Sequence, residues 1–136
     1  MALNVKLTSD QARFALAGIR LLNGVAALLV PEMLIRRLGM DPATNPAGMY
    51  AFRMFGVRTI LIGAALLQPD QALRAYSLRV AVPIHACDTI AAAFGGLRRD
   101  LPARAATMAV LISGMNTILA VIARTALDEP KRGGAT

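Results

Sequence analysis

Few side chains in this sequence could take part in chemistry, and most of these lie within long apolar stretches. His85 and Asp88 are three residues apart, so a helix places both on one face. Asn23 and Asn116 lie near the middle of two other apolar stretches. Together, His85, Asn116 and Asn23 form a candidate polar site, which could be a proton relay, a quinone head-group site or a substrate pocket. The same residues could equally form a hydrogen-bonded network that holds helices together.

Three arginines, Arg20, Arg58 and Arg79, lie well inside the apolar stretches, where a charge needs a partner or a function. Arg58 and Asp88 lie about 13 and about 12 Å from the same side of a membrane, at about 1.5 Å per helical residue. Their stretches are consecutive, so we predict a buried ion pair between them. Arg20 and Arg79 lie about 9–11 Å from the opposite side, where the sequence offers no acid. They either extend to the interface or contact an anionic head group or small anionic ligand.

The sequence contains no constellation that indicates catalysis or metal binding. One histidine, one cysteine (Cys87) and one acid within an apolar stretch are too few for a metal site. A single cysteine also excludes an internal disulfide and a CxxC redox pair. We therefore expect no catalytic residue, no metal and no resident cofactor, with a quinone as the one cofactor left open, and an enzyme is the less favoured interpretation.

Four apolar stretches must position these side chains. They cover about Ala12–Val30, Met49–Gln68, Leu73–Phe94 and Arg104–Ala123. Each is close to the roughly 20 residues that cross a bilayer, and none has the polar stripe of a soluble helix. Apolar residues make up 56% of the chain and charged residues only 17%. The sequence predicts an all-α fold, a four-transmembrane-helix bundle, with a short interfacial helix after the first span.

The interfacial helix is expected at Glu32–Met40, where apolar residues alternate with Arg36 and Arg37. Residues 1–11 form a polar lead, residues 12–126 the membrane domain, and residues 127–136 a polar tail that we expect to be disordered. The Lys and Arg residues on the two sides of the membrane differ by one, so loop charge does not decide the orientation. We place the termini in the cytoplasm.

An internal repeat relates Gly18–Pro31 to Gly56–Pro69, and both segments open with Gly-x-Arg. These openings and Asp88 resemble the DoxX-like small four-helix integral membrane proteins and their uncharacterised actinobacterial relatives. The resemblance covers about Ala12–Ala123 and implies four membrane helices. For some members it implies a membrane subunit of a quinone-linked oxidoreductase. Arginine-rich usage with two lysines fits a bacterium of high GC content, so we expect the bacterial cytoplasmic membrane.

Small and polar residues form a seam along the fourth stretch. Its members follow at spacings of four and three residues and are Ala109, Ser113, Asn116, Ala120 and Ala123. Such a seam lets helices approach closely in lipid, within the chain, against a second copy or against another protein. The net charge of +7 does not indicate nucleic acid, because the arginines lie at segment ends or inside apolar stretches. Membrane lipid is the expected partner.

These features leave three functions open. The first is an accessory or lipid-binding subunit of a larger membrane complex, favoured by the small size and the absence of a catalytic constellation. The second is a quinone- or proton-linked redox subunit that uses His85, Asp88 and Arg58. The third is a small dimeric transporter, but such carriers need an acid at mid-membrane, and Asp88 is off-centre and neutralised by Arg58.

Overall fold

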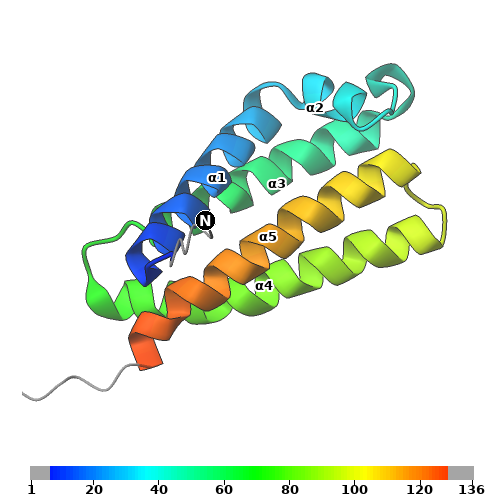
Figure 1. Cartoon of the computed structure of the whole chain (residues 1–136). Helices are drawn as coiled ribbons and strands as arrows, with labels where there is room; N and C mark the ends of the chain where they lie inside the picture. Colours follow the sequence, from blue (N-terminus) through cyan, green and yellow to red (C-terminus); the bar gives the residue numbers. More distant parts are fainter. Residues whose placement is uncertain (1–6, 129–136) are drawn as a thin grey trace, which may run out of the picture.

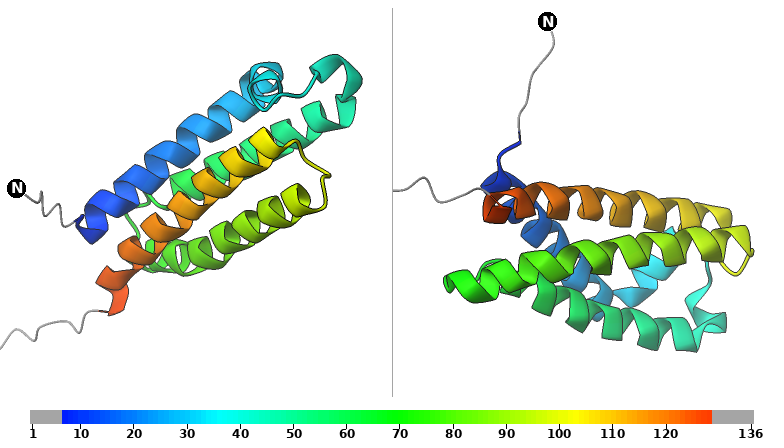
Figure 2. Two further views of the ribbon diagram at one scale, coloured as in Figure 1. Left: turned by 45° about the vertical axis from the view of Figure 1, so that its right-hand side comes forward. Right: turned by 90° about the horizontal axis from the view of Figure 1, so that it is seen from below.

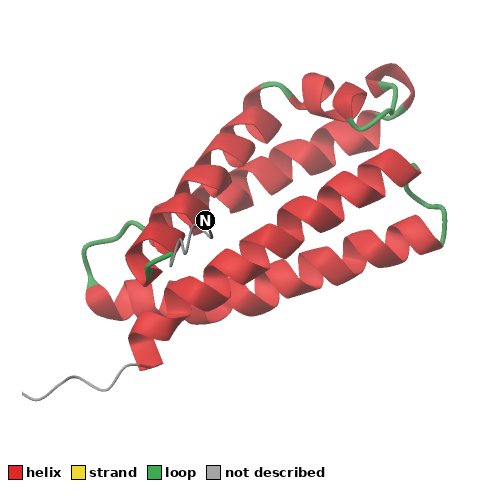
Figure 3. Cartoon of the chain, viewed as in Figure 1, coloured by secondary structure: helices red, strands yellow, loops and turns green. Residues whose placement is uncertain are grey.

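The computed structural model describes residues 7–128, which form five α-helices and one 3-10 helix, without a β-strand in this range (Figure 3). The elements are α1 (Ser9–Leu29), α2 (Pro31–Arg37), η1 (Pro42–Thr44), α3 (Pro46–Ala65), α4 (Gln71–Leu97) and α5 (Ala103–Asp128). The short helix α2 follows α1 where the sequence predicts Glu32–Met40. The start of the predicted polar lead, residues 1–6, and the predicted disordered tail beyond Asp128 lie outside the described residues.

The helix boundaries follow local signals in the sequence. Thr8 and Gln11 form a capping box at the start of α1, so two backbone N–H groups that lack helical partners are satisfied. Asn45 caps α3 through a bond from the Gly48 N–H, and Asp70 caps α4 in the same way. Pro31 ends α1 and opens α2, since proline suits the first position of a helix.

Three helices are long and apolar enough to cross a membrane: α1, α4 and residues Ala103–Thr125 of α5. This finding indicates a small integral membrane protein, and it shows that the prediction of a four-transmembrane-helix bundle is wrong. The stretch predicted as the second span is α3, which has 20 residues and is not among the three candidate spans. The helix is long enough to cross a bilayer, but Arg53 and Arg58 both lie in it, and their guanidinium groups offset much of its apolar character.

The long helices pack as two pairs, as Figures 1 and 2 show. Helix α1 packs along α3, α4 packs along α5, and α1 also contacts α5, whereas α3 and α4 touch only briefly. The start of α1, the end of α5 and the α3–α4 turn lie at one end of the molecule. Helix α2, η1 and the α4–α5 loop lie at the opposite end, which is called the α2 end below.

Helices α1 and α3 approach closely at two glycines. A Cβ added to Gly56 would lie 2.7 Å from the backbone oxygen of Gly24, and one added to Gly24 would lie 2.9 Å from the oxygen of Gly56. Neither backbone can move aside without separating the helices, so small residues are required here. Gly18, the repeat counterpart of Gly56, has no atom within 4 Å of such a Cβ. The two halves of the repeat therefore pack differently.

The apolar core lies away from the α2 end. It is formed by the first half of α1, the turn after α3, the first half of α4 and the second half of α5. Its buried members are Ala12, Leu16, Ala17, Leu66, Leu78, Ala81, Leu119, Ala120 and Ala123. Beyond this core, towards the α2 end, polar side chains replace apolar ones between the two helix pairs. The candidate site lies there.

Candidate functional site

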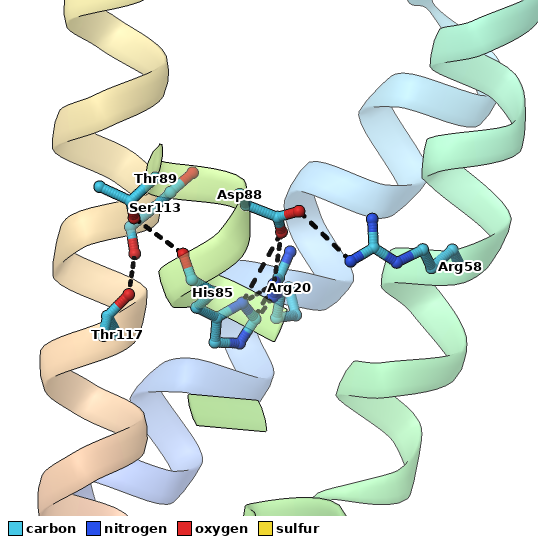
Figure 4. Close-up of polar contacts among 7 residues, drawn as sticks. All are labelled: Arg20, Arg58, His85, Asp88, Thr89, Ser113 and Thr117. Atoms are coloured by element: carbon cyan, nitrogen blue, oxygen red, sulfur yellow. Dashed lines mark hydrogen bonds and ion pairs between the residues drawn. The ribbon is translucent and has the colours of Figure 1, made fainter. Parts of the chain in front are cut away.

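A polar cluster joins three helices between the two pairs (Figure 4). Arg20 of α1 and His85 of α4 are 3% and 0% exposed. The Nε of Arg20 donates to His85 Nε2 at 3.3 Å, and Nη2 of Arg20 lies against His85 Nδ1. The same Nη2 is 3.6 Å from Asp88 Oδ2. A buried guanidinium is thus shared between an imidazole and a carboxylate, both on one face of α4.

Arg58 of α3 reaches the other oxygen of the same carboxylate. Its Nη2 lies 3.3 Å from Asp88 Oδ1, so the structure places the two residues of the predicted ion pair together. The Arg58 side chain is 47% exposed and that of Asp88 26% exposed, so this pair is less buried than the sequence predicts. The reason is that α3 and α4 barely touch, and Arg58 extends across the gap between them.

The structure separates Arg20 from Arg79, the two arginines that the sequence groups together. Arg20 points inward and contacts Asp88, whereas Arg79 is exposed on α4 and does not line the cavity described below. The membrane depth calculated from the rise per helical residue places no acid at the same depth as Arg20. That estimate neglects the length of the arginine side chain, which carries the guanidinium several ångströms from its Cα. The i,i+3 spacing of His85 and Asp88 is the signal that marks the face where Arg20 docks.

A cavity of about 500 Å³ lies between the helix pairs, next to the polar cluster and towards the α2 end. Its polar lining consists of Arg20, Asn23, Asp88, Ser113 and Asn116, with Arg37 on α2. Its apolar lining comes mostly from α2, α3 and α5 and comprises Leu34, Leu38, Ala51, Phe52, Phe55, Met108, Ala109 and Ile112. Apolar walls beside a few polar groups are typical of sites for small amphipathic molecules. Arg37 is predicted only as part of the interfacial helix, and Phe52 and Phe55 are not predicted as site residues, because nothing local in the sequence marks residues that line a pocket between helices.

Asn116 is the unusual member of this lining. It is 2% exposed, and its Oδ1 has no hydrogen-bond partner among the residues that the structure describes. A buried acceptor without a donor costs about 1–3 kcal/mol. Within residues 7–128, Arg20 uses only Nε and Nη2 for its contacts, so Nη1 is also left without a partner. Arg20 and Asn116 both line the cavity, so a ligand bound there would lie next to the two side chains.

The small-residue seam of α5 faces the interior of the molecule. Ala120 and Ala123 belong to the apolar core, and Ala109, Ser113 and Asn116 line the cavity. The hydroxyl of Thr117 donates to the Ser113 carbonyl at 2.8 Å, as that of Thr89 does to the His85 carbonyl (Figure 4). Small residues of the seam therefore contribute to packing within the chain, and contact of the seam with a partner or a second copy stays a prediction.

No three His, Cys, Asp or Glu side chains of residues 7–128 lie close enough to hold a metal ion. The fold and the site define the class of this protein as a small, all-helical membrane protein with three candidate spans. Comparison with family models, with curated proteins and with solved structures gives no match. The resemblance to the DoxX-like group therefore stays a proposal.

Proposed function

We propose that this protein is a non-catalytic, lipid-binding subunit of a larger membrane complex, and that it holds an amphipathic molecule in the cavity. The observation that carries the proposal is the buried, unpaired Oδ1 of Asn116 in an otherwise largely apolar space. A ligand that donates to this oxygen would recover the cost of burying it. The volume of about 500 Å³ falls within the roughly 300–1,000 Å³ of typical ligand pockets.

The position of the cavity supports a ligand that comes from the bilayer. It lies between the helix pairs, where α3 and α4 make few contacts, and it borders α2. Helix α2 carries Arg36 and Arg37 opposite the buried Ile35, which suits a helix that lies at the lipid head groups. The bacterial cytoplasmic membrane, with cytoplasmic termini, and membership of the DoxX-like group belong to the same proposal.

A quinone- or proton-linked redox subunit is the weaker candidate. A proton relay to a bound quinone needs a titrating group that reaches the ligand. His85 is fully buried and held by Arg20, and it does not line the cavity. Asp88 does line the cavity, but each of its carboxylate oxygens already forms an ion pair, one with Arg20 and the other with Arg58. The same ion pairs disfavour Asp88 as the mid-membrane acid of a transporter.

Native mass spectrometry of the full chain, purified in a mild detergent, tests the proposal. Ala109→Phe places a phenyl ring in the cavity, whereas Leu111→Phe is a matched control at a position that is 65% exposed. We expect the wild type and Leu111→Phe to retain an amphiphile and Ala109→Phe to lose it. A wild type that carries no amphiphile, or equal retention by both variants, would contradict binding in the cavity. A protein that co-purifies in fixed ratio would support the subunit role.

A further inference from the structure

We infer that the amphiphile in this cavity has a head group with one negative charge and a hydroxyl group. This inference rests on the proposed function. The charge is assigned by the polar cluster, and the hydroxyl by Asn116.

The polar cluster lacks one negative charge. It contains the guanidinium groups of Arg20 and Arg58 and the carboxylate of Asp88. His85 is uncharged, because a ring nitrogen that accepts a hydrogen bond from arginine carries no proton. Among the described residues, Asp88 is the only carboxylate that forms an ion pair with either arginine. The cluster therefore has a net charge of about +1, and its buried cation, Arg20, shares its one carboxylate with Arg58, although an under-compensated buried charge is costly.

We assign the missing anion to the cavity side of the buried Arg20, because the Arg58 side chain is 47% exposed and can meet solvent or lipid head groups. The other sides of the guanidinium face His85 and Asp88, and the side chain is 4% exposed. Arg20 itself lines the cavity, and its Nη1 has no partner within residues 7–128. An anionic oxygen placed there would accept a charge-assisted hydrogen bond, about twice as strong as a neutral one.

The hydroxyl group follows from Asn116. Its Oδ1 is an acceptor, so a purely anionic head group would leave it unpaired. A hydroxyl next to the anionic oxygen would donate to Oδ1, so that this acceptor would no longer be unpaired. Asn23 and Ser113 line the same space and provide further neutral hydrogen-bonding groups. Phe52 and Phe55 then contact the apolar part of the ligand.

Three amphiphiles with the same oleoyl chain separate the two features of the head group. Oleate carries the charge alone, monoolein the hydroxyls alone, and oleoyl lysophosphatidylglycerol both. Titration of each into the delipidated full chain, followed by native mass spectrometry, measures the dissociation constants. We expect lysophosphatidylglycerol to bind most tightly, oleate less tightly and monoolein least. Equal affinities for monoolein and lysophosphatidylglycerol would overturn the inference and leave the proposed function standing, whereas absence of binding by all three would overturn both.

Two variants assign the features to residues. Asn116→Leu should reduce the preference for lysophosphatidylglycerol over oleate by about fivefold, the value of one hydrogen bond of about 1 kcal/mol. Thr59→Val is the matched control, because Thr59 Oγ1 is the other buried oxygen without a partner among the described residues and lies outside the cavity lining. Thr59→Val should keep the preference for lysophosphatidylglycerol over oleate. Asp88→Asn removes the anion that competes for Arg20, so oleate should bind more tightly. An unchanged preference in Asn116→Leu, or weaker oleate binding in a folded Asp88→Asn, would overturn the assignment.

Discussion

Replacing Asp88 by alanine removes the one carboxylate that Arg20 and Arg58 share, and the two arginines should respond differently. The side chain of Arg20 is 4% exposed, so losing its counter-ion leaves a buried charge uncompensated, at a cost of about 3–5 kcal/mol. The side chain of Arg58 is 47% exposed, and an ion pair of this kind contributes only about 0–1 kcal/mol. The distances alone, 3.6 Å to Arg20 and 3.3 Å to Arg58, would favour the opposite order.

Double-mutant cycles measure both couplings. Asp88→Ala is combined separately with Arg20→Met and with Arg58→Met, and the free energy of unfolding is measured by titrating SDS into dodecyl maltoside micelles. Circular dichroism reports the loss of helix. We expect the Asp88–Arg20 coupling energy to exceed the Asp88–Arg58 coupling energy by at least about 1 kcal/mol. Asp100→Ala serves as control, because Asp100 pairs with Arg98 at an exposed end of α4 and should change stability little.

An equal or larger coupling to Arg58 would refute this reasoning. It would mean that the distance between the charged atoms, and not burial, sets the strength of these ion pairs. It would also weaken the inferred anion site, because that site depends on Arg20 being the costly, under-compensated charge. Additive losses in both cycles would mean that Asp88 stabilises the protein through neither arginine.

Three further predictions concern stability in the same assay. Gly56→Ala should destabilise the protein by about 1–3 kcal/mol, because its Cβ would lie 2.7 Å from the Gly24 backbone, whereas Gly18→Ala should be neutral or slightly stabilising. Equal effects of these two substitutions would exclude a close helix crossing at Gly56. Thr59→Val should be neutral or stabilising, since the lost hydroxyl has no partner within the described chain, and a loss above about 1 kcal/mol would reveal one. Thr8→Ala should cost about 0.5–2 kcal/mol through loss of the α1 cap, and an unchanged midpoint would mean that the first turn adds nothing to stability.

Local features of this protein can be predicted well from the sequence. Capping residues and most prolines mark where helices begin and end, as Asp70 and Pro31 do in the structure, whereas Pro83 lies inside α4. The spacing of His85 and Asp88 places both on one face of α4, because helix geometry depends only on residues close in the chain. The apolar composition indicates a membrane protein, since lipid contact needs no detail of packing.

The apolar composition of the chain leads to one wrong prediction, the number of membrane spans. The segment Met49–Gln68 is apolar enough in sequence to be predicted as a fourth span, and in the structure its helix, α3, ends at Ala65, three residues before the predicted end at Gln68. The helix is long enough to cross a bilayer, but its two arginines, Arg53 and Arg58, lower its hydropathy, and it is not among the candidate spans.

Contacts between helices that are distant in sequence were decided by the tertiary structure alone. Arg20 meets His85 and Asp88 because two helix pairs join through α1 and α5, and no local pattern specifies that arrangement. The cavity exists because α3 and α4 diverge at the α2 end, and Asn116 is unpaired because it faces that space. The physical reason is that the two kinds of feature depend on interactions over different distances along the chain. Helix formation is set by hydrogen bonds over four residues, whereas an internal space depends on how whole helices fit together.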